Sequence, residues 1–211
     1  MARHTVSALL AMLLLSGAAN PLRTTTESTT TIVATSTEQQ KMAEWALARY
    51  DAAGLELPPL AIEFVGPNLE ACEGSPARVH LNKEPILIRM CWNDDFMLLH
   101  ELAHVWEARN VPESKHEAFA SMREDVTSWA SPDVPWGQRG REHAANVIAW
   151  GLLEEPFPIS RTYPNDPKSL IIAFSFLTGT EPLHDGGDPI QSPDRRFFRP
   201  DRVNSPLESG R

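Results

Sequence analysis

The sequence predicts an α+β domain in which a short sheet of about three strands packs against an apolar helix and a second helix that follows it. Two segments predict the helices: residues 95–109 contain neither Gly nor Pro, and residues 140–151 run from one glycine to another. The strands are predicted from the alternation of apolar residues over 60–65 and from a hairpin-like pair of segments, 77–81 and 86–90, joined by residues 82–85.

Residues 1–19 have the pattern of a secretory signal peptide. Arg3 and His4 precede an apolar run, and the small residues that follow suit cleavage near Ala18 or Ala19. The run is too short for an ordinary transmembrane helix, so we expect a secreted or extracytoplasmic product with no stable membrane insertion after cleavage. An uncleaved anchor is the alternative.

The predicted domain spans residues 38–185. Residues 20–37 before it are rich in Thr and Ser and have no apolar face to bury, so we expect a linker there. Residues 186–211 after it are rich in Pro, Asp and Arg, which favours a disordered tail. The net charge of −9, with no basic stripe interleaved with aromatics, argues against a nucleic-acid partner. The sequence does not indicate an oligomeric state.

The first helix of the domain is predicted to begin at Ser36, which opens a capping-box sequence, and to end at Gly54. The predicted strands follow, and the two cysteines of the chain, Cys72 and Cys91, flank the hairpin. Because an exported protein meets oxidising conditions, we expect a disulfide between them. Closing a loop of about 20 residues would stabilise the fold by roughly 3 kcal/mol in the chain-entropy model.

The helix predicted at 95–109 contains the most informative motif, His100-Glu101-Leu102-Ala103-His104. At 3.6 residues per turn, His100 and His104 lie on one face, where both imidazoles can bind a single metal ion. Glu101 lies about 100° around the helix and is free to hold a water molecule. Apolar residues cover nearly the whole circumference, so this helix is expected to be buried on most sides. A pair of core histidines held by hydrogen bonds is the alternative.

A catalytic zinc site needs a third protein ligand. A third histidine in the extended form of the motif is excluded, because Glu107 and Asn110 stand where that form has Gly and His. We expect Glu142 instead, because small residues beside it on the helix at 140–151 allow a close approach to the first helix. Asn146, on the same face, is expected to hydrogen-bond a ligand.

Other third ligands remain open. His143 adjoins Glu142 but points about 100° away from it. His116 and Glu117 lie on a further predicted helix that follows Pro112.

A last helix is predicted from Asp166-Pro167 to Leu177. Asp is a preferred N-cap and Pro a preferred first helical residue, and Gly179 would end the helix.

His100-Glu101-x-x-His104 together with Glu142 on a following helix resembles the gluzincin branch of zincin metallopeptidases, in which a glutamate is the third zinc ligand. Asn146 stands where that branch commonly has an aspartate, so the charge expected beside the ligand histidine is missing. The segments around Trp106, 136–142 and 149–152 also resemble a group of exported actinobacterial zincin-like proteins. The resemblance covers about residues 60 to 180 and implies a zincin-like fold, a bound zinc ion and peptide hydrolysis.

The resulting hypothesis is a zinc metallopeptidase in which His100, His104 and Glu142 bind Zn²⁺. Glu101 would act as general base toward a peptide or protein substrate. Four residues are candidates for stabilising the oxyanion of the transition state: Tyr163, His143, His116 and Arg139. Two other functions stay open, an exported protein with a structural or regulatory zinc and an exported interaction protein without metal.

Overall fold

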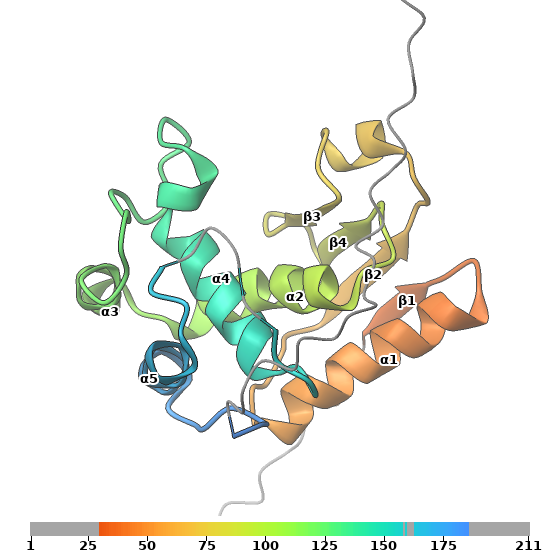
Figure 1. The fold of residues 1–211 in the computed structure, drawn as a ribbon. Helices are drawn as coiled ribbons and strands as arrows, with labels where there is room; N and C mark the ends of the chain where they lie inside the picture. The colour runs from red at the N-terminus through yellow and green to blue at the C-terminus, as the bar shows by residue number, and fades with distance from the viewer. Residues whose placement is uncertain (1–29, 158, 160–162, 186–211) are drawn as a thin grey trace, which may run out of the picture.

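The computed structural model describes residues 30–157, 159 and 163–185, and Figure 1 shows their arrangement. The predicted signal peptide, residues 20–29 of the predicted linker and the predicted tail lie outside the described residues. Within the described ranges, no helix combines the length and apolar character that crossing a membrane requires.

The sheet has four strands in the order β1-β2-β4-β3. β1 (Thr31–Val33), β2 (Leu60–Phe64) and β4 (Ile86–Met90) run parallel, and β3 (Ala77–His80) pairs antiparallel with β4. The predicted hairpin and the strand at 60–65 are thus confirmed, whereas the expected number of about three strands was wrong. The additional strand, β1, lies inside the segment predicted as a linker and is only three residues long.

One face of the sheet is apolar and forms part of the core. β2 and β4 alternate between buried and half-buried residues, and their parallel register places Leu60, Ile62 and Phe64 beside the buried residues of β4. On the opposite face, Glu63 and Arg89 form an ion pair of 3.3 Å. Apolar residues at every second position of a strand lie on one face of the sheet, and this face packs on the helices.

Helix α1 (Thr37–Ala52) begins as the sequence predicts, with one difference. The Ser36 side chain accepts the Gln39 N–H, but the Gln39 amide oxygen accepts from Thr35 N–H rather than from Ser36, so only half of the capping box forms. Near its end, the buried hydroxyl of Tyr50 donates a 2.9 Å hydrogen bond to the carbonyl oxygen of Leu99. This bond fixes α1 directly to the neighbouring helix.

That neighbour, α2 (Asp95–Asn110), crosses the middle of the molecule, with the sheet on one side and α4 (Gly140–Gly151) on the other (Figure 1). Asp94 caps it by accepting the Met97 N–H at 2.7 Å. All residues from 98 to 107 are buried. A helix that packs against a sheet and other helices at once has no solvent face, which explains why apolar residues surround it.

The remaining elements are two helices that pack beside α4 and two short 3₁₀ helices in the connections. Helix α3 (Glu113–Ala120) and helix α5 (Pro167–Thr178) pack on the far side of α4. Two short 3₁₀ helices, η1 (Leu69–Cys72) and η2 (Trp136–Gln138), lie in the connections. The predicted disulfide between Cys72 and Cys91 is present and ties η1 to the end of β4. The α+β class predicted from the sequence is confirmed.

Gly151, where α4 packs on α5, is predicted to be sensitive to substitution. A Cβ atom at Gly151 would overlap the ring of Phe174. Within a helix, Gly→Ala normally stabilises by up to about 1 kcal/mol, but here we expect Gly151→Ala to lower the free energy of unfolding by about 1–3 kcal/mol through overpacking. Denaturant unfolding measures the change. In a Phe174→Leu background the penalty should shrink, and a single variant as stable as wild type would contradict the packing described.

Candidate metal centre

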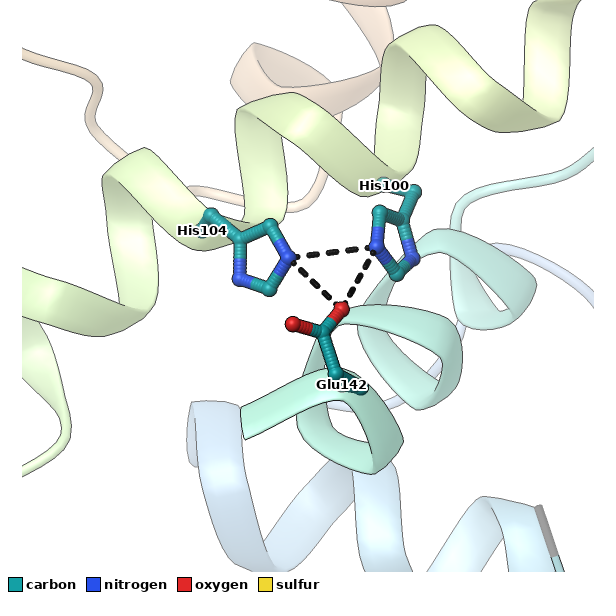
Figure 2. Close-up of side chains that lie close together, drawn as sticks. All are labelled: His100, His104 and Glu142. Carbon is teal, nitrogen blue, oxygen red and sulfur yellow. Dashed lines mark hydrogen bonds and ion pairs between the residues drawn. The ribbon is translucent and has the colours of Figure 1, made fainter. Parts of the chain in front are cut away.

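The two motif histidines lie one helical turn apart on α2 and point to a common position. Their rings are edge to face, with centroids 4.7 Å apart, and the two Nε2 atoms are separated by 3.1 Å. Both residues are 4% exposed. The i, i+4 spacing thus brings two equivalent ring nitrogens together inside the protein, as Figure 2 shows.

Glu142 completes the cluster from α4. Its Oε2 lies 3.1 Å from His104 Nε2 and 3.3 Å from His100 Nε2 (Figure 2). Ligands at tetrahedral angles and zinc-bond lengths stand about 3.3–3.4 Å from one another. The three atoms therefore form a triangle close in size to one face of a tetrahedron around a single ion. A buried group of His100, His104 and Glu142 can hold a metal ion.

Asn146, one turn beyond Glu142 on α4, orients the first histidine. Its Oδ1 lies 2.8 Å from His100 Nδ1. Because an amide oxygen only accepts, Nδ1 carries the proton and the lone pair of Nε2 faces the position shared with His104. The contact expected from the sequence is thus present, with a neutral amide as the partner.

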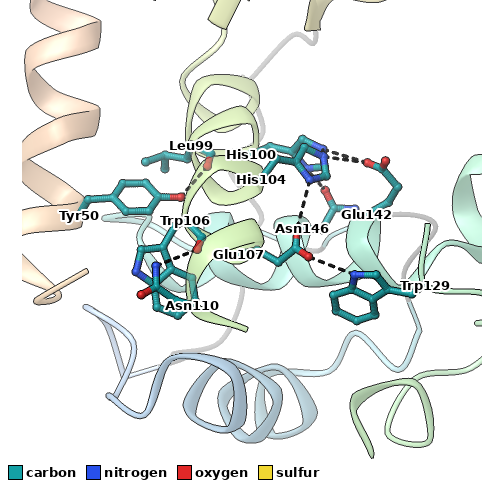
Figure 3. A network of polar contacts seen from close by, with 10 residues as sticks. All are labelled: Tyr50, Leu99, His100, His104, Trp106, Glu107, Asn110, Trp129, Glu142 and Asn146. Carbon is teal, nitrogen blue, oxygen red and sulfur yellow. Dashed lines mark hydrogen bonds and ion pairs between the residues drawn. The ribbon is translucent and has the colours of Figure 1, made fainter. Parts of the chain in front are cut away.

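Glu107 faces the other histidine, a contact that was not predicted from the sequence. Its Oε2 lies 3.9 Å from His104 Nδ1, and its Oε1 accepts the indole N–H of Trp129 at 3.1 Å (Figure 3). Among the described residues, neither His104 Nδ1 nor Glu107 Oε2 has a hydrogen-bond partner, and the carboxylate is buried. A negative group beside Nδ1 favours the tautomer that presents Nε2 to a metal ion.

Trp129 is itself held tightly in place. His116 stacks on its indole ring, with centroids 3.7 Å apart and an interplanar angle of 6°. At the start of α4, a Cβ on Gly140 would stand 2.7 Å from the Trp129 ring, so glycine allows this approach. His116, considered above as a possible metal ligand, supports the Trp129 ring that positions Glu107.

The charges of the cluster depend on one another. Burial alone would lower the pKa of His104, but the Glu107 and Glu142 carboxylates outweigh it and raise that pKa to about 9. Burial would raise the pKa of Glu142, whereas hydrogen bonds with His100 and His104 hold it well below its usual range. The two carboxylates therefore favour the protonated form of His104.

The cluster opens onto a groove of about 1110 Å³. Glu101 lines this groove and is 7% exposed, and its carboxylate makes no hydrogen bond or ion pair with another described residue. A carboxylate in this position is available to accept a proton from a molecule in the groove.

The other residues singled out from the sequence are placed away from the cluster. Glu117 is exposed on α3, and His143 is buried with its Nε2 donating to the Gly137 carbonyl oxygen at 2.8 Å. Of the four candidates for oxyanion stabilisation, Arg139 alone lines the groove, and Tyr163 is 46% exposed outside it. Arg139 Nε donates to the carbonyl oxygen of Val134 at 3.0 Å and so holds the preceding loop.

Two residues near the cluster, Glu107 and Arg141, were not predicted from the sequence to belong to the site. The signal for Glu107 was an acidic residue three positions after His104 in an otherwise apolar helix, which places both on the same face. Arg141, beside Glu142, also lines the groove. Its position offered no signal, because an arginine in a first helical turn is most often on the surface.

Comparison with protein-family models, with curated protein sequences and with solved structures found no match to this chain. The functional interpretation therefore depends on the motif and the geometry alone.

The protonated state of His104 predicts a pH-dependent metal affinity. Zn²⁺ must displace the proton, so we expect the apparent association constant to fall about tenfold for each pH unit below about 9. Competition with a chromophoric chelator at several pH values measures this slope, and metal analysis should give about one equivalent of bound zinc. In Glu142→Gln, both the affinity and the slope should decrease. A flat profile between about pH 6 and 9 would contradict the proposed protonation.

The position of Glu107 predicts a role in metal affinity. Glu107→Gln keeps the shape of the side chain but removes the charge beside His104 Nδ1, and we expect zinc affinity to fall about 10- to 100-fold. Glu113→Gln, at an exposed acid on α3, is the matched control and should bind as wild type does. Equal affinity in the Glu107 and Glu113 variants, with both folded, would show that Glu107 does not act on the histidine.

Proposed function

We propose that this protein is an exported zinc-dependent hydrolase, and that it is a metallopeptidase. The observation that carries the proposal is the convergence of His100, His104 and Glu142, with Glu101 beside them in an open groove. Two imidazoles and one carboxylate are a typical set of protein ligands for catalytic zinc, which keeps a further position for water or substrate.

The donor set supports zinc over other common ions. Mg²⁺ and Ca²⁺ prefer six or more oxygen ligands, whereas this cluster offers two nitrogens and one carboxylate at near-tetrahedral spacing. When bound, zinc would lower the pKa of a coordinated water to about 7 and polarise the substrate carbonyl.

Glu101 is the residue to which we assign proton transfer. It adjoins the metal ligand His100 in the sequence, lines the groove and has no competing hydrogen-bond donor among the described residues. In the proposed reaction its carboxylate takes a proton from the attacking water and returns it to the leaving amine. Asn146 and Glu107 would meanwhile keep the two imidazoles oriented.

The sheet edge beside the groove supports a peptide substrate. In the described part of the chain, β3 has β4 as its one strand neighbour, and residues of β3 line the groove. Cys91 N–H donates to the Pro76 carbonyl oxygen at 2.9 Å, and in an antiparallel pair every second residue turns its backbone to the partner. Ala77 and Val79 therefore turn their N–H and C=O groups to the open edge, where an extended peptide can pair.

The disulfide between Cys72 and Cys91 supports export, because such bonds persist in oxidising compartments. A zinc site without catalytic activity is the alternative function, and replacing Glu101 separates it from the proposed one.

The proposed mechanism predicts the effect of a single substitution. Glu101→Gln removes the base but leaves the three metal ligands, so we expect zinc content to stay the same while kcat/KM for peptide cleavage falls about 10²- to 10⁴-fold. Mass spectrometry of a peptide library incubated with wild-type protein identifies a cleaved peptide, and this peptide is the substrate for the measurement. A chelator should abolish wild-type cleavage, and Glu113→Gln should leave it unchanged. Chelator-sensitive cleavage that survives in Glu101→Gln would assign the chemistry to another residue.

A further inference from the structure

Arg141 is a charged residue that lines the groove and has no part in the proposed reaction. It is the second residue of α4, next to Glu142, and its side chain lines the groove. Its Nε–H is buried and has no hydrogen-bond partner, and the guanidinium makes no ion pair with a described residue. An unsatisfied buried donor is unfavourable in a folded protein, and in the groove this guanidinium is available to an acceptor from outside the chain.

Apart from Glu101, the proposed base, several charged residues around the groove have partners within the protein. Glu73 and Arg78 form an ion pair of 2.8 Å, and Asp94 caps α2 by accepting the Met97 N–H. Arg139 also lines the groove while it holds the loop that precedes η2. Although the chain has a net charge of −9, the groove thus contains a guanidinium, that of Arg141, which has no ion pair with a described residue and is suited to an anionic group.

Aromatic side chains surround the candidate metal centre within the same groove. Trp136 lies over the His100 ring with centroids 6.1 Å apart and is 40% exposed. Phe96 lies 6.5 Å from that ring, measured between centroids, and meets Phe157 edge to face at 5.2 Å. A bond placed at the metal centre would thus be flanked by apolar surface able to receive an apolar side chain.

We propose that the groove recognises peptides that have an apolar side chain next to the cleaved bond and a carboxylate nearby, and that Arg141 binds this carboxylate. The planar guanidinium matches a carboxylate with two parallel N–H donors. The carboxylate can be the C-terminus of the peptide or an Asp or Glu side chain. This inference rests on the proposed peptidase function and specifies its substrate class.

A binding experiment tests the proposal without depending on turnover. It uses the zinc-loaded Glu101→Gln protein and three hexapeptides that carry an uncharged fluorophore, with Phe-Leu at the centre and Gly and Ala elsewhere. One peptide has a free C-terminus, one has a C-terminal amide, and one has the amide with a Gly replaced by Asp. Anisotropy titration gives the dissociation constant of each peptide, and a fourth peptide with Gly-Gly at the centre tests the apolar requirement.

We expect the free-carboxylate or the Asp peptide to bind about 10- to 100-fold more tightly than the neutral one, as suits a charge-assisted bidentate contact. Which of the two binds tightly identifies the source of the carboxylate. Arg141→Gln should remove this preference, Arg141→Lys should keep part of it, and Arg109→Gln, at an exposed arginine of α2 outside the groove, should leave it unchanged. The Gly-Gly peptide should bind about tenfold more weakly.

Equal affinity for the charged and neutral peptides, or a preference that survives in Arg141→Gln, would overturn the proposal. In that case, cleavage of the library by wild-type protein would still leave the proposed function standing. Conversely, a carboxylate preference that depends on Arg141 in a protein that cleaves no peptide would support the binding site and refute the peptidase. An effect of Arg141→Gln on kcat with KM unchanged would point instead to the transition-state oxyanion and would also overturn the proposal.

Discussion

The close packing of α4 on α2 is the constraint on which the rest of the structure depends. It places Glu142 and Asn146 against His100 and His104, so polar side chains are buried where two helices meet. Buried polar groups are tolerated when they satisfy one another, and here most of the contacts run between the two helices. Alanines at 103, 145 and 149, all fully buried, allow the helix axes to approach closely enough for such contacts.

Much of this arrangement could be predicted because it is encoded locally. Helical periodicity places His100 and His104 on one face, and small residues beside Glu142 indicate which helix packs there. The caps at Asp94, Asp166 and Gly179 are local signals as well, and the helices begin and end where these residues predict. Alternation of apolar residues likewise identified the strand and the hairpin, because a half-buried strand needs a period of two.

The rest could not be predicted because it depends on distant contacts. The three-residue strand β1 has too little sequence for a pattern, and it is a strand because β2 pairs with it. The contact between Glu107 and Trp129 joins residues 22 positions apart, and the place of Arg141 in the groove likewise depends on elements distant in the sequence. For the same reason the sequence could not choose among the four oxyanion candidates, since their positions are set by the tertiary fold.

The candidate ligands come from helices that are separated along the chain by α3, η2 and their connections. While α4 has not yet packed on α2, only His100 and His104 can face a common ion, and two histidines hold an ion far more weakly than the complete set. Tight metal binding would then occur only after α4 has packed on α2. The bound ion would in turn stabilise this packing and slow the separation of the two helices. Removing the ion should therefore favour local opening of the C-terminal half of the domain.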